Sequence, residues 1–114
     1  MPVSPALHDY LPAFQGPHAE EPFLTFYPAP ASSSSTPTKT TWTRGELWTF
    51  GRRFAHVLKH QAKLHKGDCQ VHLFGGNCVE DVALRIASVM VGTVPVTVNW
   101  DSDPLDRVVF KVSL

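Results

Sequence analysis

Histidines one helical turn apart are the first residues of this sequence that could do chemistry. His56 and His60 are four positions apart, so a helix would place both imidazoles on one side, where they could bind one metal ion. His65 follows near the expected end of that helix, and Cys69 is the nearest residue that could supply a third ligand. The H-E-x-x-H pattern of zinc hydrolases is absent. We therefore interpret these histidines as surface residues of a basic helix and assign no metal ligand.

The acidic segment from Asp101 to Asp106 is a second candidate, because three carboxylates lie beside Ser102. Paired carboxylates transfer protons when a cleft shifts their pKa values. However, Asp101 and Asp103 precede Pro104, and acidic residues before a proline are typical of a helix start. Favourable interaction with the positive end of that helix accounts for two of the three carboxylates. We assign no catalytic residue here.

Two segments have features of phosphate-binding loops. Ser32 to Lys39 ends in a Ser/Thr-rich, Pro-x-Lys pattern, but it has no glycine that would turn backbone amides toward an anion. Gly75-Gly76-Asn77 lies between an expected strand and an expected helix, where α/β folds receive phosphates, yet the G-x-G-x-x-G fingerprint is absent. We interpret the first segment as a linker and the second as a tight turn, with anion binding by the second as an alternative. No cofactor-binding residue is assigned.

Composition narrows the class of protein. The 114 residues fit at most one modest domain, and ten basic side chains balance ten acidic ones. No basic patch is concentrated enough to indicate a nucleic-acid partner. We interpret the basic residues around one helix as its solvated face; they are Arg52, Arg53, Lys59, Lys63 and Lys66. The tryptophans are expected to pack at the core edges and not to stack on bases; they are Trp42, Trp48 and Trp100.

The expected location is cytoplasmic. Cys69 and Cys78 are too few for a disulfide framework and are expected to be reduced thiols. The N-terminus lacks the basic and apolar regions of a secretory signal. No apolar run approaches the roughly 20 residues that cross a bilayer, so no membrane span is expected.

The chain divides by composition near residue 40. Eight of its ten prolines lie between Pro2 and Pro37, and Ser32 to Ser35 is a serine run. Because proline fixes φ and lacks a backbone donor, we predict a Pro/Ser-rich tail over residues 1–40 that is mostly extended or irregular. Its apolar residues are expected to anchor it in places; they are Phe14, Phe23, Leu24, Phe26 and Tyr27.

Residues 41–114 alternate between helical and strand patterns. Thr43 and Glu46 have capping-box spacing, and apolar residues at three- and four-residue intervals predict a helix over about 46–64. Strands are predicted over 69–74 and 93–98, where short β-favouring runs lie between turn residues.

Glycines and helix-start signals mark the remaining boundaries. Gly67 is expected to take a positive φ in the turn before the first strand. A second helix is predicted over 79–91, capped by Asn77 and ended by Gly92. A third helix is expected to start near residue 105.

A strand, a helix and a second strand form a βαβ unit with parallel strands. Parallel strands need cover on both faces, and two strands alone make no stable sheet. We therefore predict an α/β fold: an incomplete three-layer parallel-sheet subdomain (helix, strand, helix, strand, start of a helix) after an irregular tail. The sheet is expected to be completed by a partner chain or by a C-terminal remainder of the protein.

Four segments carry a resemblance to a known family: Trp42 to Leu47, Lys66 to Val71, Asn77 to Glu80 and Val91 to Asn99. In this order they resemble the adenylate-forming, or AMP-binding, superfamily, which includes acyl-CoA synthetases, luciferases and nonribosomal peptide adenylation domains. Trp42 to Leu47 resembles the family's threonine-tyrosine-x-glutamate-leucine segment, and Lys66 to Val71 its lysine-glycine-aspartate-x-valine turn. Asn77 to Glu80 is similar to its asparagine-x-x-glutamate helix start, and Val91 to Asn99 to its glycine-containing valine-rich strand. The sequence departs from the family where Thr97 to Trp100 replaces proline-leucine-asparagine, and where Gly75-Gly76 enlarges a loop.

The resemblance covers about residues 41–114 and implies ATP-dependent adenylation of a carboxylate, often followed by thioester formation with coenzyme A. A full-length member would need ATP, magnesium and coenzyme A. The family's phosphate loop, ribose-binding aspartate, adenine-side aromatic motif and catalytic lysine lie beyond this segment, so no site residue is carried over. We expect residues 41–114 to be the N-terminal fragment of such a ligase domain, inactive by itself. The alternatives are a non-catalytic interaction module completed by a partner chain, and a nucleotide-binding protein that uses Gly75-Gly76.

Overall fold

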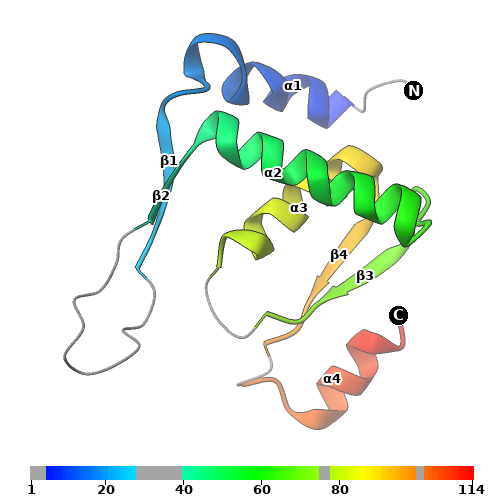
Figure 1. The fold of residues 1–114 in the computed structure, drawn as a ribbon. Helices are drawn as coiled ribbons and strands as arrows, with labels where there is room; N and C mark the ends of the chain where they lie inside the picture. Colours follow the sequence, from blue (N-terminus) through cyan, green and yellow to red (C-terminus); the bar gives the residue numbers. More distant parts are fainter. Residues whose placement is uncertain (1–4, 28–39, 75–77, 100–101) are drawn as a thin grey trace, which may run out of the picture.

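The computed structural model describes residues 5–27, 40–74, 78–99 and 102–114. These residues form a mixed α/β fold with two separate two-stranded sheets. The α-helices are α1 (Pro5–Phe14), α2 (Arg44–His56), α3 (Val79–Val91) and α4 (Leu105–Val112). The strands are β1 (Pro22–Phe26), β2 (Thr40–Thr43), β3 (Cys69–His72) and β4 (Val94–Thr97). Figure 1 shows α1 above α2, the α2–α3 pair in the middle, and α4 at the bottom beyond β3 and β4.

The prediction of an extended or irregular tail is wrong for α1 and for a 3₁₀ turn over Gly16–His18, whereas β1 is extended. Pro5 is the first residue of α1, where a missing amide hydrogen removes no helical hydrogen bond. Pro12 lies inside the helix, where it removes one such bond. Tertiary packing offsets that loss, because the Phe14 ring stacks on Trp48 with 5.6 Å between centroids.

The same N-terminal segment supplies the backbone acceptors that cap α2. The predicted capping box is confirmed: Glu46 N donates to Thr43 Oγ1 at 3.2 Å, and Thr43 N donates to the Glu46 carboxylate at 3.1 Å. The other two amides of the first turn, those of Arg44 and Gly45, donate to the carbonyls of Glu21 at 3.0 Å and Ala19 at 2.8 Å. All three initial amides of α2 are therefore paired.

The helix predicted over 46–64 is observed as α2 followed by a π-helical turn over Val57–Gln61. The helical path ends sooner than predicted because Lys63 adopts a left-handed conformation with φ of 55°. Gly67 has the predicted positive φ, 91°, and its amide donates to the Gly92 carbonyl at 2.8 Å. The turn after α2 is therefore joined to the turn after α3.

The predicted parallel βαβ unit is confirmed. β3 and β4 pair in parallel with Val71 opposite Val96, and α3 lies between them in the chain over the predicted residues. The strands are shorter than predicted because pairing stops at His72 and Thr97. α3 ends at Gly92, whose φ of 83° matches the predicted C-cap.

The residue at the N-cap position of α3 is not the predicted one. Cys78 holds the N-cap position and its side chain makes no capping hydrogen bond. The predicted cap, Asn77, lies with Gly75 and Gly76 outside the described residues.

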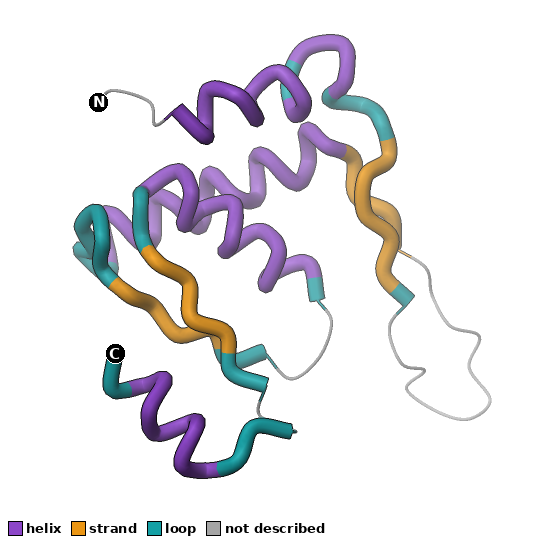
Figure 2. The backbone as a smooth tube through the Cα atoms, turned by 180° about the vertical axis from the view of Figure 1, so that it is seen from behind, coloured by secondary structure: helices purple, strands orange, loops and turns teal. Residues whose placement is uncertain are grey.

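The core lies where α2 crosses α3, above one face of the β3–β4 sheet (Figure 2). Its buried apolar residues are Leu47, Trp48, Leu58, Ala83, Ala87 and Val98. The helices approach closely at Gly51, where an added Cβ would lie 2.7 Å from Cγ2 of Ile86. Glycine at this position therefore sets the separation of the two helices.

The other face of the sheet is open to solvent within the part of the chain that the structure describes. Leu73 is 63% exposed, and α4 exposes Leu105 and Phe110 more strongly still, at 79% and 66%. α4 attaches at the end of β4, where Lys111 Nζ donates to the Thr97 carbonyl at 2.9 Å. α4 begins at Leu105, as predicted, and Pro104 occupies its N-cap position.

None of the helices described here has both the length and the apolar character needed to cross a bilayer.

Candidate functional site

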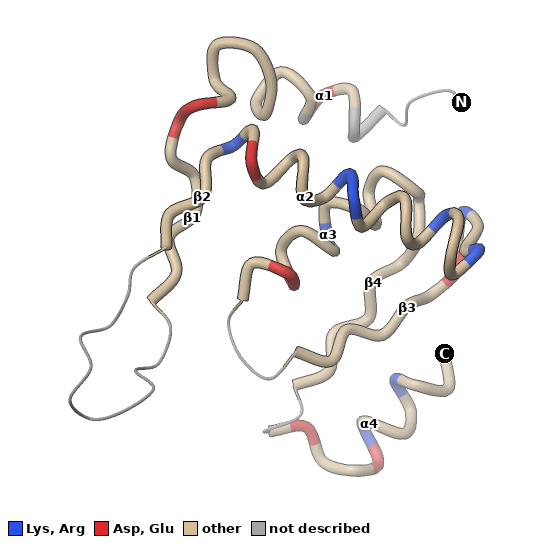
Figure 3. The backbone as a smooth tube through the Cα atoms, viewed as in Figure 1, with Lys and Arg blue, Asp and Glu red and all other residues tan. Residues whose placement is uncertain are grey.

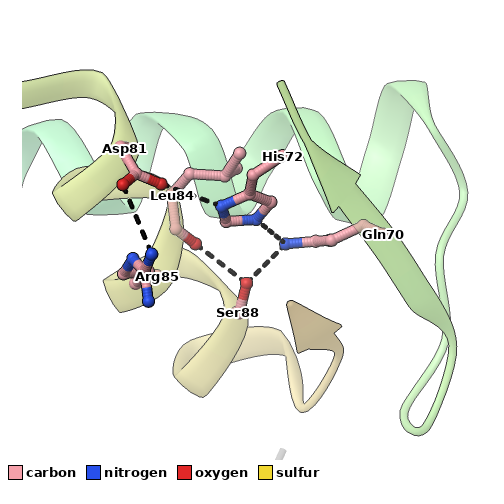
Figure 4. Close-up of polar contacts among 6 residues, drawn as sticks. All are labelled: Gln70, His72, Asp81, Leu84, Arg85 and Ser88. Atoms are coloured by element: carbon pink, nitrogen blue, oxygen red, sulfur yellow. Dashed lines mark hydrogen bonds and ion pairs between the residues drawn. The ribbon is translucent and has the colours of Figure 1, made fainter. Parts of the chain in front are cut away.

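A buried polar network lies between β3, α3 and β4, centred on His72 (Figure 4). His72, Ser88 and Thr93 are 3%, 1% and 7% exposed, respectively. β3 directs Gln70 and His72 toward α3 because alternate strand residues share one face. α3 supplies Ser88 to the same space, and the residue before β4 is Thr93.

Each ring nitrogen of His72 faces a different partner. Its Nδ1 lies 3.1 Å from the Asp81 carboxylate, and its Nε2 lies 3.3 Å from Nε2 of Gln70. The Thr93 hydroxyl donates to Oε1 of Gln70 at 3.1 Å, which orients the Gln70 amide. Because an amide nitrogen only donates, Nε2 of His72 must accept. With the Gln70 amide in this orientation, the hydrogen on Nδ1 of His72 is donated to Asp81.

Both hydrogens of the Gln70 amide are used in the network. One is donated to Nε2 of His72 and the other to the Ser88 hydroxyl. Ser88 donates its own hydrogen to the Leu84 carbonyl at 2.9 Å, one turn earlier in α3. The side chains of Gln70, His72, Ser88 and Thr93 each make at least one hydrogen bond, as is usual for buried polar groups.

The cluster contains serine, histidine and aspartate, but its geometry excludes the chemistry of a catalytic triad. In a triad the histidine accepts the serine hydrogen, whereas here His72 contacts Gln70 and Ser88 donates to a carbonyl. Ser88 is also almost fully buried, so a substrate has no access to its oxygen. The network joins the strands to α3 and does not activate a nucleophile.

Asp81 connects this network to the surface. Its side chain is partly exposed and accepts from Arg85 Nη2 at 3.4 Å. Asp81 also lines a pocket of about 310 Å³ between β1 and α3, together with Cys78 and Tyr27. A change in the charge of Asp81 would therefore act directly on His72, its hydrogen-bond partner.

The structure places the other predicted candidates apart from this network. The rings of His56 and His60 lie 4.6 Å apart on the exposed side of α2 and its π-helical turn. His65 is exposed near Asp68, with 3.7 Å between its Nδ1 and the carboxylate. Within the described ranges, no three potential ligands come together around a metal position.

The acidic segment before α4 has a structural role at Asp103. Its carboxylate accepts from Lys111 Nζ at 2.6 Å and from the Asn99 amide at 3.0 Å, and Arg107 lies 3.6 Å away. The hydrogen bond from Lys111, followed by that from Asn99, holds the pKa of Asp103 below its usual range. No side chain caps α4 by a hydrogen bond, and Asp103 acts instead through Lys111 and the Asn99 amide. Asp101 lies outside the described residues.

The basic and aromatic residues lie as predicted where the structure describes them. Figure 3 shows Lys and Arg along the second half of α2 and in the turns after it, and these side chains are exposed. Trp42 stacks on Phe50 at 5.5 Å and Trp48 on Phe14, so both pack within the fold. Cys69 is exposed, Cys78 is half-buried, and neither forms a disulfide. Trp100 and the Ser32 to Lys39 segment lie outside the described residues.

The network around His72 was missed from the sequence, although a partial signal was present. Gln70 and His72 alternate with apolar residues in the predicted strand, which places two polar groups on one face. That face is covered by α3, where Ser88 is the matching polar residue. Polar residues on the facing sides of a strand and a helix were the available sign of a buried network.

Comparison with known proteins assigns no family to the chain: no protein-family model matches the sequence, and no curated protein matches it.

Proposed function

We propose that residues 41–114 are the N-terminal part of an ATP-dependent, carboxylate-adenylating domain of the acyl-CoA synthetase type. The supporting observation is that two of the family-like segments, Lys66 to Val71 and Val91 to Asn99, form a pair in space. The Gly67 amide donates to the Gly92 carbonyl, and the Val94 amide donates to the Asp68 carbonyl, both at 2.8 Å. Two segments that resemble one family, occur in the order of that family and also contact each other indicate the family more specifically than either segment alone.

The pairing gives a physical reason for the residue types in these two segments. Both glycines have positive φ, a conformation that other residues adopt with strain. In addition, a Cβ at Gly92 would lie 3.1 Å from Cγ of Lys66, because the lysine stem packs over this glycine. The lysine-glycine-aspartate turn and the later glycine therefore depend on each other.

The uncovered sheet face supports the proposed incomplete three-layer architecture. Val71, Leu73 and Val94 expose apolar surface on the face away from α3. Parallel sheets are covered on both faces in stable domains, so further chain is needed on this side. In the proposed domain, this cover comes from segments outside residues 41–114.

The proposed whole domain uses ATP, magnesium and coenzyme A in the cytoplasm. The residues that hold these groups belong to family segments that no position of this chain matches. The 114 residues by themselves are therefore expected to lack adenylation activity.

Two measurements test the proposal. The purified 114-residue chain is assayed for ATP–pyrophosphate exchange across a panel of carboxylic acids, and no exchange is expected. The endogenous protein is then captured with an antibody against residues 1–40, and its intact mass and exchange activity are measured. A mass several times larger, with exchange activity, supports the proposal. Robust exchange by the 114 residues alone contradicts the expected inactivity, and a larger protein without exchange activity contradicts the family assignment.

A second candidate function is a non-catalytic interaction module completed by a partner chain. The observation that favours it is the apolar surface of α4, where Leu105 and Phe110 are strongly exposed. Such surface commonly marks an interaction site. An endogenous protein of this length that co-purifies with a stoichiometric partner, and melts more sharply with it, would support this function. A monodisperse monomer with one cooperative transition would count against it.

A further inference from the structure

A groove lies where the N-terminal segment packs on the α2–α3 pair. Its volume is about 290 Å³, at the lower end of the range for small-molecule sites. The apolar lining residues are Phe14, Phe23, Trp48, Val82, Ile86 and Val89. Arg85 also lines it and is the sole charged side chain among the described lining residues.

We propose that this groove binds a small amphipathic anion, with its apolar body between the rings and helix α3 and its head at Arg85. This site does not depend on the proposed function. It is formed by residues in the described part of the chain, and the adenylation proposal uses none of them. It adjoins the buried network at one point, because Arg85 lines the groove and also donates to Asp81.

The aromatic walls suit an apolar body. Phe14 meets Phe23 edge to face at 5.5 Å and stacks on Trp48 at 5.6 Å, so the three rings hold one another in place. Phe23 and Val89 remain partly exposed, at 45% and 39%. An alkyl chain or an aromatic ring in the groove would remove this surface from water, which is the main source of affinity in apolar sites.

The charge of the groove selects an anionic head. Arg85 is 51% exposed, and its contact with Asp81 at 3.4 Å is longer than a strong charge-assisted hydrogen bond. A guanidinium has five N–H donors, and the one hydrogen bond formed by Arg85 within the described residues leaves donors for a ligand. The Arg85 stem lies along the apolar wall while its head reaches the rim, an arrangement common for long cationic side chains.

A second cation, Arg44, lies near the groove without lining it. The guanidinium of Arg44 lies over the Phe23 ring, 5.2 Å from its centroid, and 3.3 Å from the Glu21 carboxylate. Glu21 balances the charge of Arg44, so Arg85 is the cation that would contact the head of a ligand. A cationic ligand of the same shape could not accept the hydrogen bonds that Arg85 offers and is expected to bind more weakly.

The test uses Trp48 as the reporter in a Trp42→Phe/Trp100→Phe background. The protein is titrated with decanesulfonate, decanol and decyltrimethylammonium below their micellar concentrations, and Trp48 emission is followed. We expect saturable binding of decanesulfonate, with a dissociation constant about tenfold or more below those of the other two. Equal affinity for all three probes, or no saturation by decanesulfonate, would overturn the proposal.

Matched variants test separately how the head and the body of the ligand contribute to binding. Arg85→Gln should weaken decanesulfonate about tenfold and leave decanol unchanged, whereas Arg52→Gln, on the exposed side of α2, should change neither. Val89→Trp should fill the groove and abolish binding of both. Unchanged decanesulfonate affinity in Arg85→Gln would contradict the assignment of the head site.

Two further measurements distinguish a defined site from diffuse binding and from self-association of the chain. Amide chemical-shift changes on decanesulfonate binding should be confined to residues around Trp48 and α3, and changes spread over the whole chain would contradict a defined site. Trp48 emission should not depend on protein concentration. If it does, a second copy of the chain occupies the groove, and the proposal of a small anion fails.

Discussion

Gln70 holds the buried network together, because its amide bonds to His72, Ser88 and Thr93. We predict that Gln70→Leu lowers the free energy of unfolding by about 1–3 kcal/mol, because polar groups of these residues lose their buried partners. Urea denaturation measures this difference. Gln61→Leu, at an exposed position in the π-helical turn, is the matched control and should change stability little. Equal stabilities of the two variants would show that the network contributes nothing.

The tautomer of His72 is a second prediction at the residue scale. The network requires the hydrogen on Nδ1, since Nε2 accepts from Gln70. Long-range ¹H–¹⁵N correlation spectra at neutral pH should therefore show the Nδ1–H tautomer for His72. His56, which is exposed and lies outside the network, provides a comparison in the same spectrum. An Nε2–H signal for His72 would mean that Gln70 is oriented the other way.

Separation along the chain explains which residue roles could be predicted from the sequence. Thr43 and Glu46 are three positions apart, so their reciprocal hydrogen bonds follow from local spacing. His72 and Asp81 lie nine positions apart on different elements, and their contact exists only because α3 folds back on β3. The predictable roles were local, and the network required the tertiary structure.

At the scale of elements, Gly51 controls how closely α2 approaches α3. We predict that Gly51→Ala destabilises the protein by about 1–3 kcal/mol, because its new methyl group would overlap Cγ2 of Ile86. This sign is opposite to that in an exposed helix, where alanine stabilises relative to glycine by about 1 kcal/mol. Urea denaturation distinguishes the two signs.

A double-mutant cycle tests the cause of that effect. Ile86→Ala removes the overlapping methyl group and is expected to cost stability by itself. Adding Gly51→Ala to Ile86→Ala should then cost less than in the wild type, or stabilise. If both substitutions simply add, overlap between these side chains is not the reason.

The attachment of α4 should depend on pH through Asp103. The pKa of its carboxyl is lowered, chiefly by the hydrogen bond from Lys111, so the ionised form is favoured more in the folded than in the unfolded state. Its stabilising effect is therefore complete above the ordinary aspartate range of about 3.9 and is lost as the pH falls through the lowered folded pKa. Hydrogen exchange of α4 amides as a function of pH measures this loss.

Variants assign the effect to this carboxylate. Asp103→Asn should loosen α4 already at neutral pH and remove the acid-dependent step. Asp106→Asn, at an exposed position in the first turn of α4, should retain that step. An unchanged step in Asp103→Asn would assign the pH dependence to another group.

Element boundaries were predictable where a local signal determined them. α3 occupies the predicted residues because its apolar spacing ends at Gly92, which takes the left-handed conformation. The strands were predicted too long, since strand length depends on how far a partner extends. The helix in the N-terminal segment could not be predicted from its proline content, because it is held by contacts such as that of Phe14 with Trp48, which lies far along the sequence.

At the scale of the whole molecule, the N-terminal segment is part of the fold. It covers Trp48 with Phe14 and provides carbonyls for the first amides of α2. The hydrogen bond from His18 lowers the pKa of Glu21, whose carboxylate lies beside Arg44. The segment thus joins α2 through aromatic packing, backbone hydrogen bonds and an ion pair.

The final prediction concerns the cooperativity that these contacts produce. Phe14→Ala should lower the free energy of unfolding by roughly 2 kcal/mol, about half the usual cost at a core phenylalanine, because this ring is half-buried. Phe110→Ala, which removes a ring that is 66% exposed, is the control and should stay within about 0.5 kcal/mol of the wild type. Because the Phe14 ring contacts Trp48 in the core, its loss should shift the denaturation midpoint of α1 and of the β3–β4 sheet equally. Amide signals from both regions report the two midpoints in one urea titration. If α1 unfolds first while the midpoint of β3 stays unchanged, the N-terminal segment is a separate unit that adds no stability to the βαβ core.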